Sequence, residues 1–146
     1  MTDSGMDEAT EYGDFPLKRY LGMEMAEAGS GVGIARVELA EQHQNPNGVA
    51  HGAVLFAMVD TAMGKATMDV LDDGRFCASV DVQLRFIRPA SSGWLEAEAT
   101  VLKKGRSVVH LEARVVDDQK RLIATAAGTF AIIDMPSLSA EGRPVS

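Results

Sequence analysis

The stretch NPNGVAHGAVLFAMVDTAMGKA, residues 45–66, joins a turn-rich loop to a long apolar segment. Asn, Pro and Gly favour turns in the loop, whereas the segment after His51 is rich in Ala, Met and Leu and has no proline. We therefore predict a helix from about Gly52 to Leu71, ended by the DDG sequence at residues 72–74. Apolar residues cover nearly its whole circumference, so this helix should be buried. They are Ala53, Val54, Leu55, Phe56, Ala57, Met58, Val59, Ala62, Met63 and Ala66.

Strand-like segments lie on both sides of this helix in the sequence. Alternating apolar residues predict one strand at residues 32–40, and four more at 76–88, 93–104, 106–117 and 120–133. The connections between the last four are short, as between antiparallel neighbours. In the first of the four, one face is predicted to carry Phe76, Ala78, Val80, Val82, Leu84 and Phe86, and the other Ser79, Asp81, Gln83 and Arg85.

The order of these segments predicts the fold class. One strand, one long helix and four antiparallel strands form an α+β domain of two layers, in which a single antiparallel sheet wraps around one long central helix. Residues 15–24 are expected to form one or two helical turns ahead of it. A sheet with a single central helix leaves edges to cover, so association between chains is expected.

Composition limits the class of protein. The 146 residues are 46% hydrophobic and 24% charged, as in a soluble globular protein, and we expect one domain over residues 15–134. Residues 1–14 and 135–146 are expected to be a flexible leader and tail. A net charge of −7 argues against a nucleic-acid partner. We expect no membrane span, and the single cysteine, Cys77, favours the reducing cytoplasm.

Asp60 stands alone in the apolar helix. Its neighbours three and four positions away are Phe56, Ala57, Met63 and Gly64, none of which is basic. A buried carboxylate without a partner is costly, so it usually has a chemical role or a partner elsewhere in the fold. Two interpretations stay open at this point: a catalytic acid, or a carboxylate that accepts hydrogen bonds or reaches the surface at a helix edge.

The start of the helix is the second indication of chemistry. A helix start leaves backbone N–H groups unpaired, and no Ser, Thr or Asp directly precedes Gly52 to cap them. Free N–H groups directed at a carbonyl oxygen are what an oxyanion hole needs. Alternatively, Asn47 caps the helix through a longer turn and Gly52 only eases packing.

Together these residues resemble a known family. The loop NPNGVAHGA with an Asp nine positions after the His is similar to the signature of hotdog-fold acyl-CoA thioesterases of the PaaI (phenylacetyl-CoA thioesterase-like) type. Asn45, Gly48, His51, Gly52 and Asp60 match in register, and the similarity covers most of residues 32–133. The family's second Gly after the His is Ala53 here, which puts the range of substrates in question more than catalysis.

The resemblance implies a role for each matching residue. The backbone N–H of Gly52 or Ala53 would polarise the thioester carbonyl, and Asp60 from the facing subunit of a homodimer would act as general base or nucleophile. Asn45 would place the carbonyl or the water, Ser79 would position the water, and His51 would brace the loop. The implied reaction converts acyl-CoA and water to a carboxylic acid and CoA. No metal or further cofactor is expected, and the assembly expected is a dimer of dimers.

Coenzyme A also requires cations for its phosphates. Arg85, Arg88, Lys103, Lys104 and Arg106 lie at strand ends and in the KKGR turn, the two regions that the family uses for the nucleotide. Arg88 and Arg106 are the preferred pair, because Arg suits phosphate geometry better than Lys. The alternative is that these are ordinary solvated surface charges.

Other interpretations stay open or fail. A hotdog-fold protein that binds acyl thioesters without hydrolysing them is the main alternative. An enoyl thioester hydratase is a second, although the hydratase branch of the hotdog superfamily carries an Asp/His pair in another motif. The three histidines have no metal-ligand spacing, and no GxSxG serine hydrolase motif is present. Met58, Met63 and Met68 are expected to fill the core, or else to line an adaptable acyl pocket.

Overall fold

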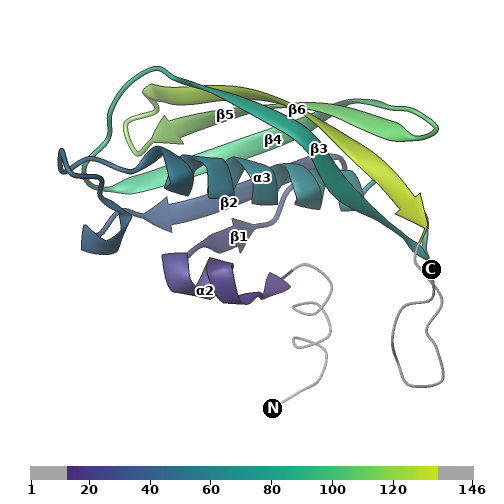
Figure 1. The fold of residues 1–146 in the computed structure, drawn as a ribbon, viewed down its shortest axis with the longest axis horizontal. Helices are drawn as coiled ribbons and strands as arrows, with labels where there is room; N and C mark the ends of the chain where they lie inside the picture. The colour runs from purple at the N-terminus through teal and green to yellow at the C-terminus, as the bar shows by residue number, and fades with distance from the viewer. Residues whose placement is uncertain (1–12, 135–146) are drawn as a thin grey trace, which may run out of the picture.

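The structure, a computed structural model, describes residues 13–134 and consists of one six-stranded antiparallel sheet around one long helix (Figure 1). The predicted tail, and all but Gly13 and Asp14 of the predicted leader, lie outside the described residues. The elements are α2 (Pro16–Leu21), β1 (Glu24–Ala26), β2 (Val32–Glu38), the short 3-10 helix η2 (Glu41–His43), α3 (Gly52–Met68), β3 (Arg75–Phe86), β4 (Trp94–Lys104), β5 (Val108–Asp117) and β6 (Leu122–Asp134).

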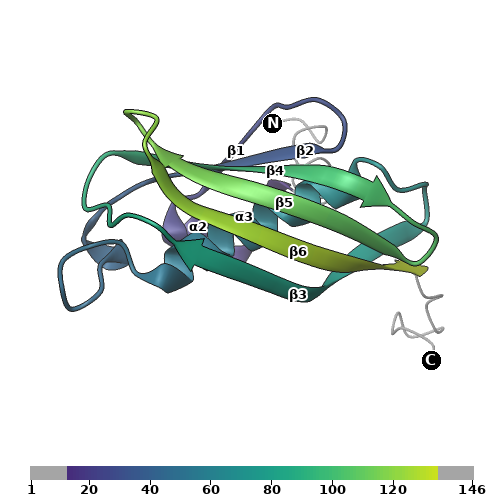
Figure 2. The ribbon, with the colours of Figure 1, turned by 90° about the horizontal axis from the view of Figure 1, so that it is seen from above.

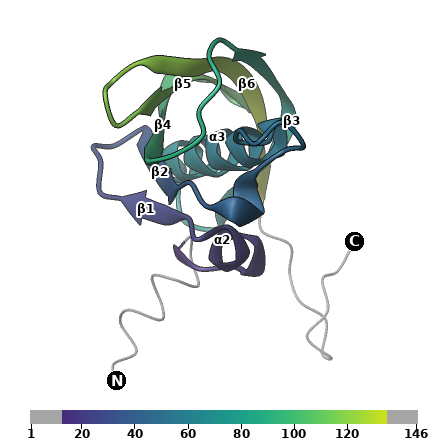
Figure 3. The same ribbon diagram turned by 90° about the vertical axis from the view of Figure 1, so that its left-hand side faces the viewer.

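The sheet has the strand order β1-β2-β4-β5-β6-β3, and every neighbouring pair is antiparallel (Figure 2). It curves around α3, whose turns are seen inside the sheet in Figure 3. The predicted fold class is therefore confirmed. β1 was not predicted, because three residues are too few to show alternation.

The core lies between α3 and the concave face of the sheet. Met58, Val59 and Met63 of α3 are fully buried, and they pack against the inward residues of β2, β4, β5 and β6. Gly33 lets the helix approach β2 closely, because a Cβ atom there would collide with the carbonyl oxygen of Ala62.

The expectation that α3 is buried all round is wrong on one side. Ala53 is exposed and Phe56 is 42% exposed, because the sheet does not cover the part of the helix that lies beside the free edge of β3. The helix also ends at Met68 rather than at Leu71. An apolar stripe of α3 is thus left open next to Asp60.

β3 runs back along α3. Cys77, near its start, places its Sγ 3.9 Å from the carbonyl oxygen of Gly64, whereas Phe86 at its end lies against Gly52. β3 therefore lies alongside α3 over most of the length of the helix.

A β-bulge at Val80 corrects the predicted faces of β3. The pairing with β6 skips Val80, which is 61% exposed, between Ser79 opposite Phe130 and Asp81 opposite Thr129. One extra residue reverses the alternation. Phe76 and Ala78 therefore point away from α3. Ser79 was predicted to lie on the non-core face, but it points toward α3, on the same side of the sheet as the buried Phe130.

Candidate active site

The loop before α3 is held in place by a buried histidine. His43 is 2% exposed; its Nδ1 accepts a hydrogen bond from the N–H of Ala40, and its Nε2 lies 2.8 Å from the carbonyl oxygen of Leu21. The first bond makes Nδ1 the acceptor, so Nε2 carries the proton and donates to Leu21. The carbonyl oxygen of His43 accepts from the N–H of His51. His43 thereby ties the end of α2 to the start of α3.

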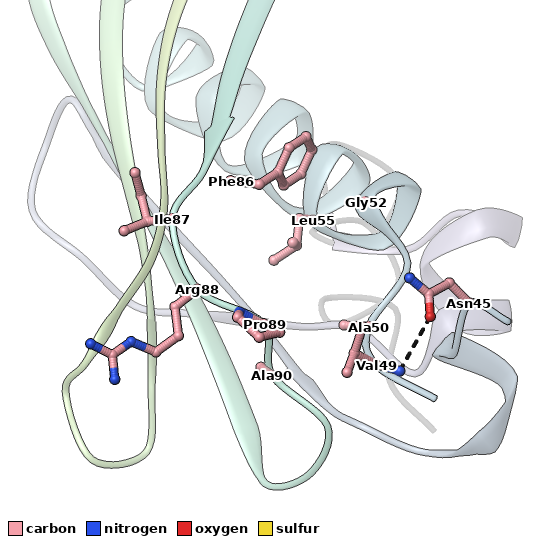
Figure 4. Close-up of a pocket in the computed structure, with 10 residues that line it drawn as sticks. All are labelled: Asn45, Val49, Ala50, Gly52, Leu55, Phe86, Ile87, Arg88, Pro89 and Ala90. Atoms are coloured by element: carbon pink, nitrogen blue, oxygen red, sulfur yellow. Dashed lines mark hydrogen bonds between the residues drawn. The ribbon is translucent and has the colours of Figure 1, made fainter. Parts of the chain in front are cut away.

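Asn45 builds the turn that follows. Its Oδ1 accepts hydrogen bonds from the N–H groups of Asn47 and Val49, at 2.8 and 3.3 Å. Gly48 completes the turn with a φ of 80°, a conformation that favours glycine. The Nδ2 of Asn45 has no acceptor among the described residues and is turned toward the chain that leads into α3 (Figure 4). Asn45 therefore keeps one donor free at the predicted site.

His51 caps the helix, which neither of the predicted alternatives contained. Its Nδ1 accepts a hydrogen bond from the N–H of Ala53 at 2.9 Å. The N–H of Ala53 is therefore already engaged, and Asn47 does not cap the helix. The N–H of Gly52 has no acceptor within residues 13–134. Of the two predicted carbonyl donors, Gly52 is the one left free.

A largely apolar groove opens at Gly52 (Figure 4). It has a volume of about 410 Å³ and lies between the 45–52 loop, the first turn of α3 and the chain after β3. The ring of Phe86 lies 3.1 Å from the place that a Cβ atom at residue 52 would occupy, and it is 60% exposed. The lining residues are Asn45, Val49, Ala50, Gly52, Leu55, Phe86, Ile87, Arg88, Pro89 and Ala90.

The side chain of Asp60 faces a second cavity, which lies between α3 and β3. Its Oδ1 is buried and has no hydrogen-bond partner among the described residues, and Lys65 pairs with Asp69 instead. Burial raises the pKa of the Asp60 carboxyl above its ordinary value, and the hydroxyl of Ser79 offsets part of that rise. A half-buried carboxylate with a raised pKa and an unsatisfied oxygen is a candidate general base.

Cys77 lies in the same cavity. Burial, together with the negative charge of Asp60, raises the pKa of its thiol to about 11. The thiol therefore stays protonated at neutral pH, so Cys77 is not suited to act as a nucleophile.

The predicted CoA cations do not gather in one place on a single chain. Arg88 follows β3 at the Gly52 end, and Arg85 lies on the outer face of the sheet, opposite Thr125. The KKGR turn, with Lys103, Lys104 and Arg106, lies near the start of β3. The carbonyl oxygen of Ser107, directly after this turn, accepts a hydrogen bond from the N–H of Ile132, and Ile132 pairs with Cys77 in the sheet. Cys77 and Phe86 are nine positions apart on β3, which separates these ends by about 30 Å. None of the five cations forms an ion pair with another residue of the 13–134 segment.

A family model described as the thioesterase superfamily matches residues 47–124, which is more than half of the chain. This chain belongs to the thioesterase superfamily. The matched region starts in the Asn45 turn and ends in β6, so it contains the lining residues of both cavities except Asn45 and Phe130. The prediction of a thioester hydrolase with the hotdog fold is thereby confirmed at the level of the family.

Individual thioesterase-superfamily relatives agree with this assignment. A thioesterase from Haemophilus influenzae has the same fold, with a TM-score of 0.83 and 22% identity over 94% of each chain. The PaaI protein of the Escherichia coli phenylacetic acid degradation operon gives a TM-score of 0.80 at 21% identity, over 91% of this chain and 95% of that one. A 1,4-dihydroxy-2-naphthoyl-CoA hydrolase from Listeria monocytogenes is 19% identical over 80% of this chain and 94% of its own length.

Sequence reasoning missed two features of this thioesterase-superfamily chain. Phe86 was assigned only to a strand face, yet its ring forms a wall of the groove at Gly52. Met68 and Cys77 were not connected with Asp60, although all three line one cavity.

Residues 13–134 hold no cluster of three or more side chains suited to a metal, and none of their helices has the length and apolarity to cross a membrane.

Proposed function

We propose that this protein hydrolyses the thioester of an acyl-CoA, with Asp60 as the general base. The observation that carries the proposal is the half-buried carboxylate of Asp60, which has an unpaired oxygen and faces Ser79 in an open cavity. The raised pKa makes this carboxylate a better base than an ordinary aspartate, because it binds the proton of water more strongly.

The chemistry uses few groups. Asp60 removes a proton from a water that Ser79 positions, and that water attacks the carbonyl carbon. The N–H of Gly52 stabilises the resulting oxyanion, with help from the Nδ2 of Asn45. The carbon–sulfur bond then breaks, CoA leaves as the thiolate and takes up a proton, and the carboxylic acid remains.

A single chain does not bring these groups together. Gly52 and Asp60 are eight residues apart on one helix, which corresponds to about 12 Å along its axis. A base and an oxyanion donor must both lie about 3 Å from the reacting atoms. We therefore propose that Asp60 acts on a thioester held at the Gly52 of a second copy.

The free edge of β3 is the surface for this pairing. β3 is 12 residues long and is unpaired on one side. It carries the exposed apolar side chains of Val80 and Phe86, Ile87 directly after it is also exposed, and so is Phe56 on α3. Long apolar edge strands seldom remain uncovered. Antiparallel pairing of β3 with the same strand of a second copy, about a two-fold axis, turns the helix start of one chain toward the Asp60 half of the other.

The same two-fold axis accounts for the separation of the predicted CoA-binding cations into two groups on each chain. It brings the Arg88 end of one chain toward the KKGR end of its partner, so one nucleotide could meet cations from both. The Listeria monocytogenes relative acts on a CoA thioester of an aromatic acid, which supports CoA as the leaving group. Aromatic and medium-chain acyl groups are both proposed substrates, and a dimer of dimers remains the predicted assembly.

The test is release of CoA from a panel of aryl- and alkyl-CoA thioesters, with Asp60→Asn compared with wild type. Loss of a general base lowers kcat by roughly 10²- to 10⁴-fold. Asp69→Asn is the matched control, since it removes an acid from the end of the same helix, outside both cavities, and we expect wild-type rates. Equal rates for Asp60→Asn and wild type would reject Asp60 as the base. Bound but unhydrolysed acyl-CoA in the wild type would favour a binding module.

A further inference from the structure

The cavity beside Asp60 extends toward the end of α3. Its volume is about 460 Å³, and it is lined by Asp60, Met68, Phe76, Cys77, Ala78, Ser79 and Phe130. Asp60, Gly64 and Met68 are spaced four residues apart, so they lie along one face of the helix. Cys77 contacts Gly64, which places the thiol midway between Asp60 and Met68.

The two cavities of the chain differ in chemistry. The groove at Gly52 includes Arg88 and the free donor of Asn45, whereas no Lys or Arg lines the cavity beside Asp60. The polar side chains of that second cavity, Asp60 and Ser79, are at one end, and apolar groups continue from them to Met68. An uncharged acyl group suits the second cavity, and the polar arm of CoA, which ends in phosphates, suits the first.

We infer that the acyl group lies in the cavity between α3 and β3, directed from Asp60 to Met68, and that Cys77 and Met68 determine which acyl groups fit. The inference rests on the proposed thioesterase function and adds the direction of the substrate to it. Asp60 and Met68 are eight positions apart on α3, which corresponds to about 12 Å along the helix. That length admits a medium chain or a single ring, and Cys77 limits the width halfway along.

Side-chain size at two positions gives distinct expected effects. Cys77→Leu adds bulk at the middle of the cavity, so the ratio of kcat/KM for octanoyl-CoA to that for butyryl-CoA should fall by about tenfold or more. Met68→Ala removes bulk at the end, so the ratio for dodecanoyl-CoA to octanoyl-CoA should rise by a similar factor. Cys77→Ala is the variant that keeps the fold without added bulk, and it should accept phenylacetyl-CoA at least as well as wild type.

Two controls separate this inference from its alternatives. Ala50→Leu narrows the groove at Gly52, so it should lower kcat/KM for every acyl group by the same factor and leave the ratios unchanged. Leu102→Ala changes an exposed side chain outside both cavities and should have no effect. Wild type is measured first, because a wild type inactive on all thioesters would overturn the proposed function itself. If wild type is active but only Ala50→Leu changes the ratios, the acyl group lies in the groove at Gly52 and the inference is wrong.

Discussion

Asp60 on α3 and Ser79 on β3 face each other across one cavity, and the bulge at Val80 is what places them on the same side. Without the extra residue, the alternation that directs Val82 and Leu84 toward the helix would direct Ser79 away from it. The carboxylate would then lose the hydroxyl that favours its charged form. The bulge is therefore a part of the proposed active site as well as an irregularity of the sheet.

Ser79→Ala should make hydrolysis more sensitive to acid. The Ser79 hydroxyl lowers the pKa of Asp60, so its removal raises that pKa further above the ordinary value. A base must be ionised to act, so the acid limb of the kcat/KM profile should move to higher pH. On the alkaline plateau we expect a loss on the order of 10-fold from the missing hydrogen bond to water. The control Ser92→Ala should leave the acid limb of the kcat/KM profile at the wild-type pH. The same result for Ser79→Ala would show that Ser79 does not influence the pKa of Asp60.

Asp60→Asn should stabilise the fold while it removes activity. The folded-state pKa of Asp60 is raised, so the ionised carboxylate destabilises the native state at any pH above that pKa. The carboxyl is nearly half solvated, so we expect a gain of only about 0.5 kcal/mol in the free energy of unfolding at pH 8. The gain should disappear as the pH falls through the pKa of Asp60, which urea unfolding at several pH values would measure. A variant less stable than wild type at pH 8 would contradict the assignment.

Gly52→Ala should reduce activity more than stability. The new Cβ atom would lie 3.1 Å from the Phe86 ring, which must give way by a few tenths of an ångström at the edge of the groove, while the first turn of a helix tolerates alanine well. We expect a fall in kcat/KM of roughly 100-fold, because small displacements at a reacting centre have effects of that size. The free energy of unfolding should change by less than about 1 kcal/mol. Adding Phe86→Leu should restore part of the activity, and a double variant as poor as Gly52→Ala would refute the steric explanation.

Cys77 should react slowly with alkylating agents in the folded protein. With a pKa of about 11, roughly one thiol in a thousand is ionised at pH 8, far fewer than in the unfolded chain. The charge of Asp60 contributes to this shift, so Asp60→Asn should lower the pKa of Cys77 and accelerate its reaction with iodoacetamide. Mass spectrometry would follow the labelling, with urea-unfolded wild type as the reference. Equal rates in the two folded proteins would show that Asp60 does not influence this thiol.

Local sequence was sufficient to predict most elements of the fold. The start of α3 at Gly52 and the five longer strands follow from periodicity and from Gly and Pro positions, which act over a few residues. The bulge at Val80 was not predictable, because it depends on the register with β6, which is distant in the sequence. His51 as a helix cap was missed for another reason: histidine is an uncommon capping residue, and its ring reaches the N–H of Ala53 only in this loop geometry.

The candidate site was predicted as a set of residues rather than as an arrangement. Asp60 was identified because an unpaired acid in an apolar helix is unusual, which is a property of the helix alone. The sequence could not show that Arg88 and Arg106 lie near opposite ends of β3, since that follows from where the hairpin of β4 and β5 turns. Nor could it show that Met68 and Cys77 share a cavity with Asp60, because the cavity depends on how β3 returns along α3.

The central claim is that two chains complete each active site, and activity in mixed dimers tests it most directly. Asp60→Asn retains an intact helix start, whereas Gly52→Val blocks the groove beside Phe86 but retains Asp60. Each variant alone should be nearly inactive. Co-expressed with different tags and purified as the heterodimer, they should regain about half of the wild-type rate, because one of the two sites combines both intact halves. A heterodimer as inactive as either parent would show that the site lies within one chain, and would contradict the proposal.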